Sequence, residues 1–218
     1  MPLRRPTALL FDLDGTLVDS RQDIAGSLNA ALEELGRARL TLETVLPMIG
    51  DGARALIVRA LTSSDGVLPD DALIDRGARL YNVAYLAAPC VHTTMLPGVA
   101  AALALAIPCA LVTNKPRNVA TLVIEHLGIS AAFAAIYGGG DGPLKPSPDG
   151  IRQVCAAMGV VPADTWFIGD GPQDVLAGKS AGCVTIAVPG IAERSHALAA
   201  EPDVVLESLE GLPALLPT

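Results

Sequence analysis

The sequence is poor in aromatic residues, in cysteine and in basic residues. Aromatic residues make up 3% of the 218-residue chain, so we expect a core built mainly from Ala, Leu and Val. The formal net charge is −8, and no basic stripe is present that would neutralise nucleic-acid phosphates, so we expect no nucleic-acid partner. The four cysteines are widely spaced and form no CxxC pair, which argues against disulfides and against a zinc site.

Long hydrophobic runs are also missing. No apolar stretch approaches the roughly 20 residues that cross a bilayer, and no apolar segment typical of a signal peptide precedes the first expected strand. We therefore expect a cytoplasmic protein without membrane association. The chain is nevertheless 51% hydrophobic and only 17% charged, which excludes disorder and allows a sizeable core.

The most informative segment is residues 12–16, Asp-Leu-Asp-Gly-Thr. It follows the short apolar run of residues 8–11, which indicates a buried strand. Asp12 and Asp14 then lie at the carboxyl end of that strand, where open α/β sheets bind ligands, and Gly15 permits a sharp turn. Burying two carboxylates without partners costs much free energy, so we expect a positive charge to lie beside them.

The rest of the chain divides into a helical part and a part in which strands alternate with helices. Apolar residues at helical spacing predict helices after Ser20, over residues 53–61 and near residues 70–86, and Gly36 is expected to end the first. Farther along, short apolar runs predict strands at residues 109–113, 134–137, 165–168, 184–188 and, at an edge, 204–206. This alternation predicts an α/β fold with a doubly wound parallel sheet.

The same pattern predicts two domains. We expect residues 1–18 and 91–218 to form the sheet-containing core. Residues 19–90 would then be a helical cap, inserted after the first strand.

Polar residues follow three later strands of the predicted sheet: Thr113 and Asn114, then Lys145, then Asp170 and Asp174. Because the carboxyl ends of parallel strands meet at one edge, we expect these side chains near the two aspartates of residues 12–16. One lysine cannot balance four acids and an anionic substrate. A hard divalent cation with oxygen ligands, Mg²⁺, fits this set better than zinc, since no His or Cys accompanies it.

In this order the motifs resemble those of the haloacid dehalogenase-like hydrolase superfamily, over nearly the whole chain. The resemblance rests on the DxDGT of residues 12–16, the strand-end Thr113, the Lys145 of KPSP and the GDxxxD that holds Asp170 and Asp174. It implies a Rossmann-like core that hydrolyses phosphate esters with Mg²⁺. The chain departs from the pattern at Gly171, where relatives often carry Ser or Thr, and this puts the geometry of the acidic loop in doubt.

The resemblance implies a reaction through an aspartyl-phosphate. Asp12 would be the nucleophile, and Asp14 would protonate the leaving alcohol and then activate water. Mg²⁺ would be held by Asp12, by Asp170 and by the backbone carbonyl of Asp14. Asp174 would lie close by or just outside the metal's ligands.

Phosphate binding would fall, by the same resemblance, to Thr113, Asn114, Lys145 and Gly15, helped by backbone N–H groups. Lys145 would also pair with the nucleophile. Ordinary structural roles are the alternatives. Thr113 and Asn114 could cap the next helix, Lys145 could be a solvated loop lysine, and Asp174 could be a first-turn acid favoured by the helix dipole.

Residues 49–61 are similar to the cap of phosphoglycolate phosphatases, in which G-(N/D)-G precedes an apolar helix. The similarity implies that the cap chooses the substrate through Gly50, Asp51, Gly52, Arg54 and Arg59. The two arginines lie about 140° apart around a helix, so they cannot both face the site. The alternative is that both are solvated helix arginines.

The substrate class follows from the same resemblance. The dehalogenase branch lacks the second acid, which is present here as Asp14, so dehalogenation is disfavoured. A phosphatase for a small phosphorylated metabolite is implied, 2-phosphoglycolate first, acting as a monomer or homodimer. The alternatives are another small ester (a sugar phosphate, a secondary-metabolite phosphate or pyrophosphate), a β-phosphoglucomutase-like phosphomutase, or a catalytically idle phosphate-binding module.

Overall fold

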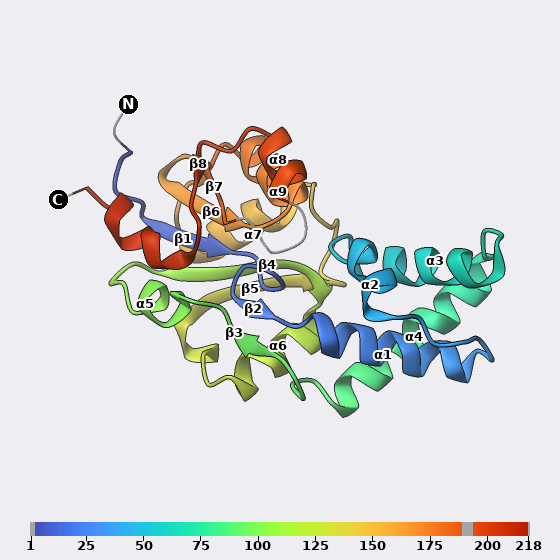
Figure 1. Ribbon diagram of the computed structural model, residues 1–218. Helices are drawn as coiled ribbons and strands as arrows, with labels where there is room; N and C mark the ends of the chain where they lie inside the picture. Colours follow the sequence, from blue (N-terminus) through green and yellow to red (C-terminus); the bar gives the residue numbers. More distant parts are fainter. Residues whose placement is uncertain (1–2, 189–193, 218) are drawn as a thin grey trace.

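A parallel sheet forms the centre of the structure, a computed structural model that describes residues 3–188 and 194–217. Within these residues the strand order is β5-β4-β1-β6-β7-β8, and neighbouring strands are parallel (Figure 1). The strands are β1 (Ala8–Phe11), β4 (Cys109–Pro116), β5 (Phe133–Gly139), β6 (Thr165–Gly169), β7 (Val184–Ala187) and β8 (Val204–Val205). The predicted α/β class and the predicted strands are confirmed.

The strand order changes direction beside β1. The chain adds β4 and β5 on one side of β1 and then crosses to add β6, β7 and β8 on the other. All four residues of β1 are buried, because β1 is paired along both edges and its side chains face apolar clusters on both sides of the sheet. Ligand sites of open α/β sheets lie beyond the carboxyl ends of the strands at such a point.

Helices cover both faces of the sheet. The larger ones are α6 (Arg117–His126), α7 (Asp149–Met158) and α8 (Pro172–Ala181). Leu9 and Phe11 of β1 face a cluster that includes α6, and Leu10 faces a second cluster that includes α7 and α8. Successive strand residues thus point to opposite faces, as the pleat requires. Shorter elements complete this part: α5 (Val99–Leu103), α9 (Arg194–Ala199), η2 (Ser130–Ala132), η3 (Pro162–Asp164) and η4 (Leu209–Leu215).

A group of helices lies beside the sheet rather than on its faces (Figure 1). It comprises α1 (Arg21–Glu34), α2 (Leu42–Val45), η1 (Leu46–Met48), α3 (Gly52–Asp65) and α4 (Asp71–Ala87), with α1 and α3 both packed on α4. The three long helices were predicted, whereas α2 and η1 are too short to show a periodic pattern. We call this group the helical segment; that it is a separate cap over residues 19–90 stays a prediction.

Two short strands mark where the chain leaves the sheet and returns to it. β2 (Val18–Asp19) pairs antiparallel with β3 (Thr94–Met95). The buried Asp23 of α1 reinforces this junction, because its carboxylate accepts hydrogen bonds from the backbone N–H groups of His92 and Thr93 and from the Thr93 hydroxyl. Strands of two residues show no alternation, so the sequence did not predict this ribbon.

The cysteines and the helix lengths bear on two expectations from composition. All four cysteines are free thiols; Cys109, Cys155 and Cys183 are buried and Cys90 is partly buried. They pack as small apolar side chains. Among the described residues, no helix combines the length and the apolar character that crossing a membrane would require.

Two glycines in helix interiors should respond oppositely to alanine. A Cβ at Gly77 in α4 would lie 2.7 Å from Cγ2 of the buried Ile57, whereas a Cβ at the exposed Gly26 in α1 would meet nothing within 4 Å. We expect Gly26→Ala to raise the free energy of unfolding by about 0.5–1 kcal/mol through helix propensity. Gly77→Ala should lower it by about 1–3 kcal/mol through overpacking. Urea denaturation measures both, and a stabilising Gly77→Ala would contradict the close packing of α3 on α4.

Candidate active site

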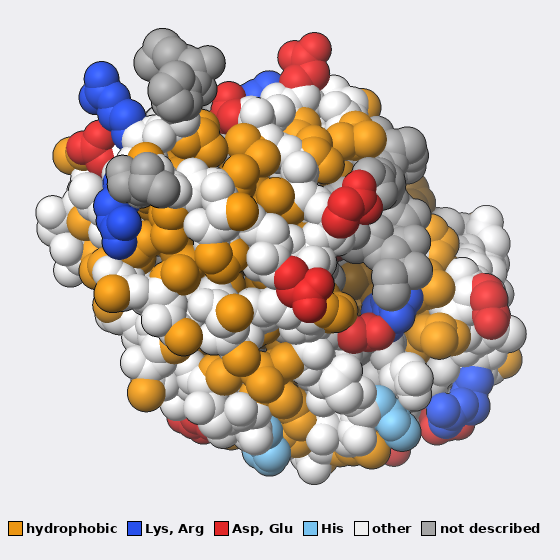
Figure 2. Space-filling model, turned by 60° about the vertical axis from the view of Figure 1, so that its left-hand side comes forward, with side chains coloured by type: hydrophobic (Ala, Val, Ile, Leu, Met, Phe, Trp, Pro, Cys, Tyr) orange, Lys and Arg blue, Asp and Glu red, His pale blue; other side chains and the backbone are white. Residues whose placement is uncertain are grey.

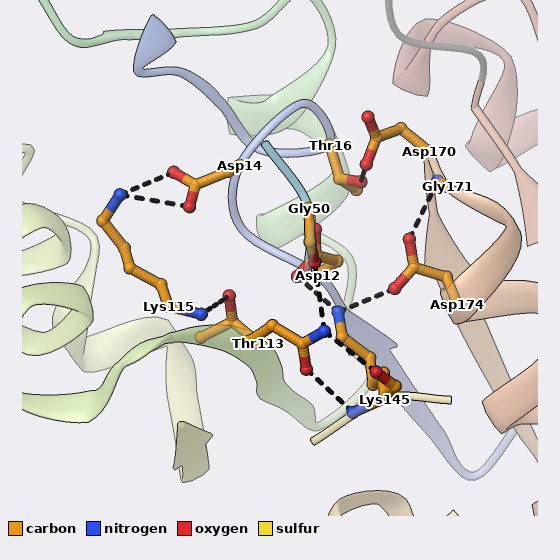
Figure 3. Close-up of polar contacts among 11 residues, drawn as sticks. Asp12, Asp14, Thr16, Gly50, Thr113, Lys115, Lys145, Asp170, Gly171 and Asp174 are labelled. Carbon is orange, nitrogen blue, oxygen red and sulfur yellow. Dashed lines mark hydrogen bonds and ion pairs between the residues drawn. The ribbon is translucent and has the colours of Figure 1, made fainter. Parts of the chain in front are cut away.

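Three carboxylates meet at the carboxyl edge of the sheet, beside β1 (Figure 3). Asp12 directly follows β1, and its backbone N–H continues the pairing with β6 by donating to the carbonyl of Ile168 at 2.9 Å. Asp170 directly follows β6, and Asp174 lies in the first turn of α8. One carboxylate oxygen from each of the three aspartates lies within 4.8 Å of the others. The predicted gathering of acids at this edge is therefore present.

A buried lysine lies between two of these acids. The ammonium of Lys145 donates to Asp12 Oδ1 at 2.5 Å and to Asp174 Oδ1 at 2.7 Å. Burial opposes the charge of Lys145, but the two carboxylates outweigh it and raise its pKa above the ordinary value. Lys145 is thus a fixed positive charge within the acidic cluster and not a solvated loop lysine.

The amide of Asn114 holds the loop that carries Lys145. Its Oδ1 accepts from the Lys145 backbone N–H at 2.8 Å, and its Nδ2 donates to the Lys145 carbonyl at 3.0 Å. Nδ2 also donates to the carbonyl of Gly50 in the helical segment, at 3.0 Å. The Asn114 side chain thus joins two loops and also lines the cavity beside the strand ends, and its predicted part in phosphate binding stays a prediction.

Asp14 points away from the acidic cluster, toward a second lysine. Its carboxylate accepts from the ammonium of Lys115 at 2.9 and 3.1 Å and from the hydroxyl of Ser20. Lys115 also donates to the hydroxyl of Tyr85 on α4, at 2.9 Å. Ser20 does precede α1, as predicted for an N-cap, but its side chain bonds Asp14 and caps nothing.

The sequence did not single out Lys115 as a site residue. The signal was its position, directly after Thr113 and Asn114 at the same strand end. Thr113 is buried, and its hydroxyl accepts from the Lys115 backbone N–H at 3.2 Å. The end of β4 therefore brings three polar residues to the site rather than the expected two.

Gly15 lets Asp170 approach the turn after β1. Its φ is +86°, a conformation that side chains disfavour, and a Cβ there would lie 2.2 Å from Asp170 Oδ2. The hydroxyl of Thr16 donates to Asp170 Oδ1 at 3.4 Å. Only glycine at position 15 leaves room for the Asp170 carboxylate beside the DxDGT turn.

The acidic loop after β6 accommodates Gly171. Its backbone N–H donates to Asp174 Oδ2 at 2.9 Å. Gly171 is the N-cap residue of α8, so this hydrogen bond belongs to the cap of the helix. A Cβ at Gly171 would lie 2.4 Å from Gln173 Nε2, so glycine leaves room for that side chain. Asp174 is a first-turn acid of α8, as the alternative interpretation expected, and its other oxygen accepts from Lys145, a contact that the sequence did not predict.

Among the described side chains at this edge, the formal charges do not balance. Four carboxylates, counted as ionised, face the two ammonium groups of Lys145 and Lys115, which leaves two formal negative charges. Burial is the main cause that raises the pKa of Asp12 to about 6, against the opposing effect of Lys145. Burial, followed by repulsion from Asp174 and Asp12, raises the pKa of Asp170 well above its ordinary value. One divalent cation would restore neutrality, and the clustered carboxylate oxygens are the donors that Mg²⁺ prefers.

A cavity of about 560 Å³ lies between the strand ends and the helical segment. Figure 2 shows a hollow between the larger body and the smaller lobe, with acidic and basic side chains beside its mouth. The strand ends contribute Asp12, Asp14 and Thr113 to the lining, and the helical segment contributes Gly50 and Leu56. The site is therefore open to a small molecule while being covered from the side of the helices.

The cap residues expected to choose the substrate are not equally placed. Gly50, Asp51 and Gly52 line the cavity together with Arg59, whereas Arg54 is not among the lining residues. Arg54 pairs with Asp71 and Asp75 on α4. Arg59 pairs with Asp51 and donates to the carbonyl of Met48 at 2.8 Å. One of the two arginines thus reaches the cavity, as their spacing required.

The chain is similar in sequence and in fold to known proteins. The family model of haloacid dehalogenase-like hydrolases matches residues 9–188. A phosphoglycolate phosphatase of Chromobacterium violaceum is 38% identical over 193 residues, which cover 86% of this chain and 87% of that protein. One of Pseudomonas syringae pv. tomato is 35% identical over 214 residues, 95% of this chain and 78% of that protein. A crystal structure of a predicted phosphoglycolate phosphatase from Haemophilus somnus superposes with a TM-score of 0.87 at 28% identity, covering 96% and 97% of the two chains.

Replacing Asp12 by Asn should stabilise the metal-free protein at neutral pH. The pKa of Asp12 rises from 3.8 to about 6 on folding, so its ionisation costs stability as the pH rises between these values, and the cost persists above them. We expect Asp12→Asn to raise the free energy of unfolding at pH 7 by on the order of 1–2 kcal/mol in the presence of a chelator. The exposed Asp65→Asn is the control, expected to lower it by less than about 1 kcal/mol. Destabilisation by Asp12→Asn beyond that of the control would contradict the excess of buried negative charge at this edge.

Proposed function

The chain belongs to the haloacid dehalogenase-like hydrolase family, and from that membership we propose that it is a magnesium-dependent phosphatase of 2-phosphoglycolate. One observation carries the proposal. Asp12 and Asp14, two residues apart, have different partners: Asp12 joins the acidic cluster and Lys145, and Asp14 faces Lys115 and Ser20. Two carboxylates in different surroundings can divide the roles of nucleophile and acid between them.

The reaction proceeds in two steps that both use Asp12. A carboxylate oxygen of Asp12 attacks phosphorus, the bond to the ester oxygen breaks, and Asp14 gives that oxygen its proton, which yields glycolate and an aspartyl-phosphate. Asp14 then takes a proton from water, whose oxygen attacks phosphorus and releases inorganic phosphate and the Asp12 carboxylate. The hydroxyl of Thr113 and the backbone N–H groups after it hold the phosphoryl oxygens, and Lys145 keeps Asp12 in place.

The metal site of this proposal comprises the carboxylates of Asp12 and Asp170 and the backbone carbonyl of Asp14. Asp174 lies close enough for its carboxylate to belong to the same cluster. Bound Mg²⁺ would neutralise charge on the transferring phosphoryl group. The support is the excess of two negative charges and the oxygen-only donor set.

The choice of 2-phosphoglycolate rests on the relatives. Two proteins named phosphoglycolate phosphatase share 38% and 35% identity with this chain over most of its length. We further propose that the enzyme is cytoplasmic, acts as a monomer or homodimer and binds a small phosphorylated metabolite. A panel of phosphate esters tests the substrate: 2-phosphoglycolate should give the highest kcat/KM, ahead of sugar phosphates and pyrophosphate. Phosphate transfer within a sugar phosphate would favour a mutase, and no phosphate release from any ester would favour an idle binding module.

Asp12→Asn is expected to abolish turnover. The neutral amide cannot attack phosphorus, so kcat should fall by about 10,000-fold or more. Release of inorganic phosphate from 2-phosphoglycolate measures the loss, and circular dichroism shows that the fold persists. Asp65→Asn, remote from the cavity, should keep wild-type turnover. Turnover of Asp12→Asn within tenfold of wild type would remove Asp12 as the nucleophile.

Activity is expected to require Mg²⁺ and to be suppressed by Ca²⁺. Both ions bind oxygen ligands, but Ca²⁺ prefers longer bonds and more ligands, which would misplace the nucleophilic carboxylate. Binding should also stabilise the fold, by about 2.7 kcal/mol at a hundredfold excess over Kd, and so raise the Tm by several degrees. The Tm of Asp170→Asn should respond less to Mg²⁺. Full turnover after thorough chelation would overturn the metal assignment.

A further inference from the structure

We propose that Lys115 binds the carboxylate of the substrate, so that specificity for a carboxylate-bearing ester lies in strand β4 rather than in the arginines of the helical segment. The inference rests on the proposed function and deepens it, because it assigns the contact that tells 2-phosphoglycolate from other phosphate esters. It differs from the sequence-based expectation, which placed this choice in the cap, at Gly50, Asp51, Gly52, Arg54 and Arg59.

Lys115 is both buried and adjacent to the cavity. Its side chain is 2% exposed, yet Lys115 lines the cavity together with Asp14 and Thr113. Its ammonium contacts Asp14 of the core and Tyr85 of the helical segment. A cation in this position meets whatever group of the substrate lies beyond the ester oxygen.

The distances place a substrate carboxylate within reach of Lys115. Asp14, as the acid, must contact the ester oxygen at about 3 Å. The Lys115 ammonium lies 2.9 and 3.1 Å from the two Asp14 oxygens. In 2-phosphoglycolate a single methylene separates the ester oxygen from the carboxylate. A carboxylate that close to the oxygen held by Asp14 lies beside the ammonium that Asp14 also binds.

The ammonium can accommodate this second carboxylate. A lysine has three N–H donors, of which two now go to the two oxygens of Asp14 and one to Tyr85. One donor is enough to hold Asp14. The other can turn to the substrate without breaking the contact with the helical segment.

The arginines that line the cavity are weaker candidates. Arg21 pairs with Asp19 and Arg59 with Asp51, whereas the carboxylate that Lys115 contacts is that of Asp14, the proposed acid at the ester oxygen. Their side chains are also 33% and 40% exposed, against 2% for Lys115. Attraction between opposite charges is stronger where water is excluded. A substrate carboxylate is therefore expected to bind more tightly at Lys115 than at either arginine.

The experiment compares two substrates that differ in one group: 2-phosphoglycolate and 2-phosphoglycolamide, in which a neutral amide replaces the carboxylate and the phosphate is kept. Their kcat/KM values are measured with Mg²⁺ for the wild type, Lys115→Gln, Lys115→Met and Lys115→Arg, with Arg59→Met as the matched control. Loss of the Asp14 contact alone would slow both substrates equally. We expect Lys115→Gln and Lys115→Met to lose about 10- to 100-fold more on phosphoglycolate than on the amide. Lys115→Arg and Arg59→Met should keep most of the wild-type preference.

Binding provides a second readout that does not depend on turnover. Calorimetric titration of Asp12→Asn with each compound, with and without Lys115→Gln, should show the same selective loss for phosphoglycolate. The titration tests the role of Lys115 even if the Lys115 variants turn over neither substrate. Lys115→Gln and Lys115→Met differ in polarity, so at least one is expected to keep the native circular dichroism spectrum.

The outcomes separate this inference from the proposed function. If the wild type does not prefer phosphoglycolate to its amide, the carboxylate is not recognised and the proposed substrate fails. If the wild type prefers phosphoglycolate and the neutral Lys115 variants keep that preference, the proposed function stands and Lys115 is overturned as the carboxylate-binding residue. A preference lost in Arg59→Met instead would assign the contact to the helical segment.

Discussion

The rest of the site depends on one interaction, the pairing of the buried Lys145 ammonium with the carboxylates of Asp12 and Asp174. Two carboxylates about 4 Å apart repel by roughly 4 kcal/mol at an effective dielectric of about 20, so acids from separate elements do not gather without a compensating charge. The cluster draws on β1, β6 and α8, and the lysine comes from the loop before α7. The remaining negative charge makes the same cluster a site for a divalent cation.

The position of that lysine is linked to the helical segment through one amide. Asn114 bonds the backbone of Lys145 on one side and the carbonyl of Gly50 on the other. The Asn114 side chain thereby connects Gly50 and Lys145, which are far apart in the sequence, beside the cavity.

Asp12 and Asp14 show how a turn can give two neighbouring carboxylates different chemistry. Asp12 lies in the acidic cluster, whereas Asp14 lies among donors: Lys115 and the hydroxyl of Ser20. Gly15 keeps the turn tight enough for Asp170 to approach from β6. The two halves of the site therefore differ in the sign of their surroundings, with the cavity between the sheet and the helices lying across both.

The sequence by itself determined the strands, the order of the motifs and the convergence of the acids, because buried runs and strand-end polar residues are local patterns that a parallel sheet brings to one edge. It did not determine where side chains point. Ser20 precedes its helix as predicted yet bonds Asp14, the Asn114 side chain joins two loops, and Lys115 pairs with Asp14. Only the tertiary structure decided these contacts, since each partner comes from a separate element and the competing hydrogen bonds are similar in energy until packing selects one.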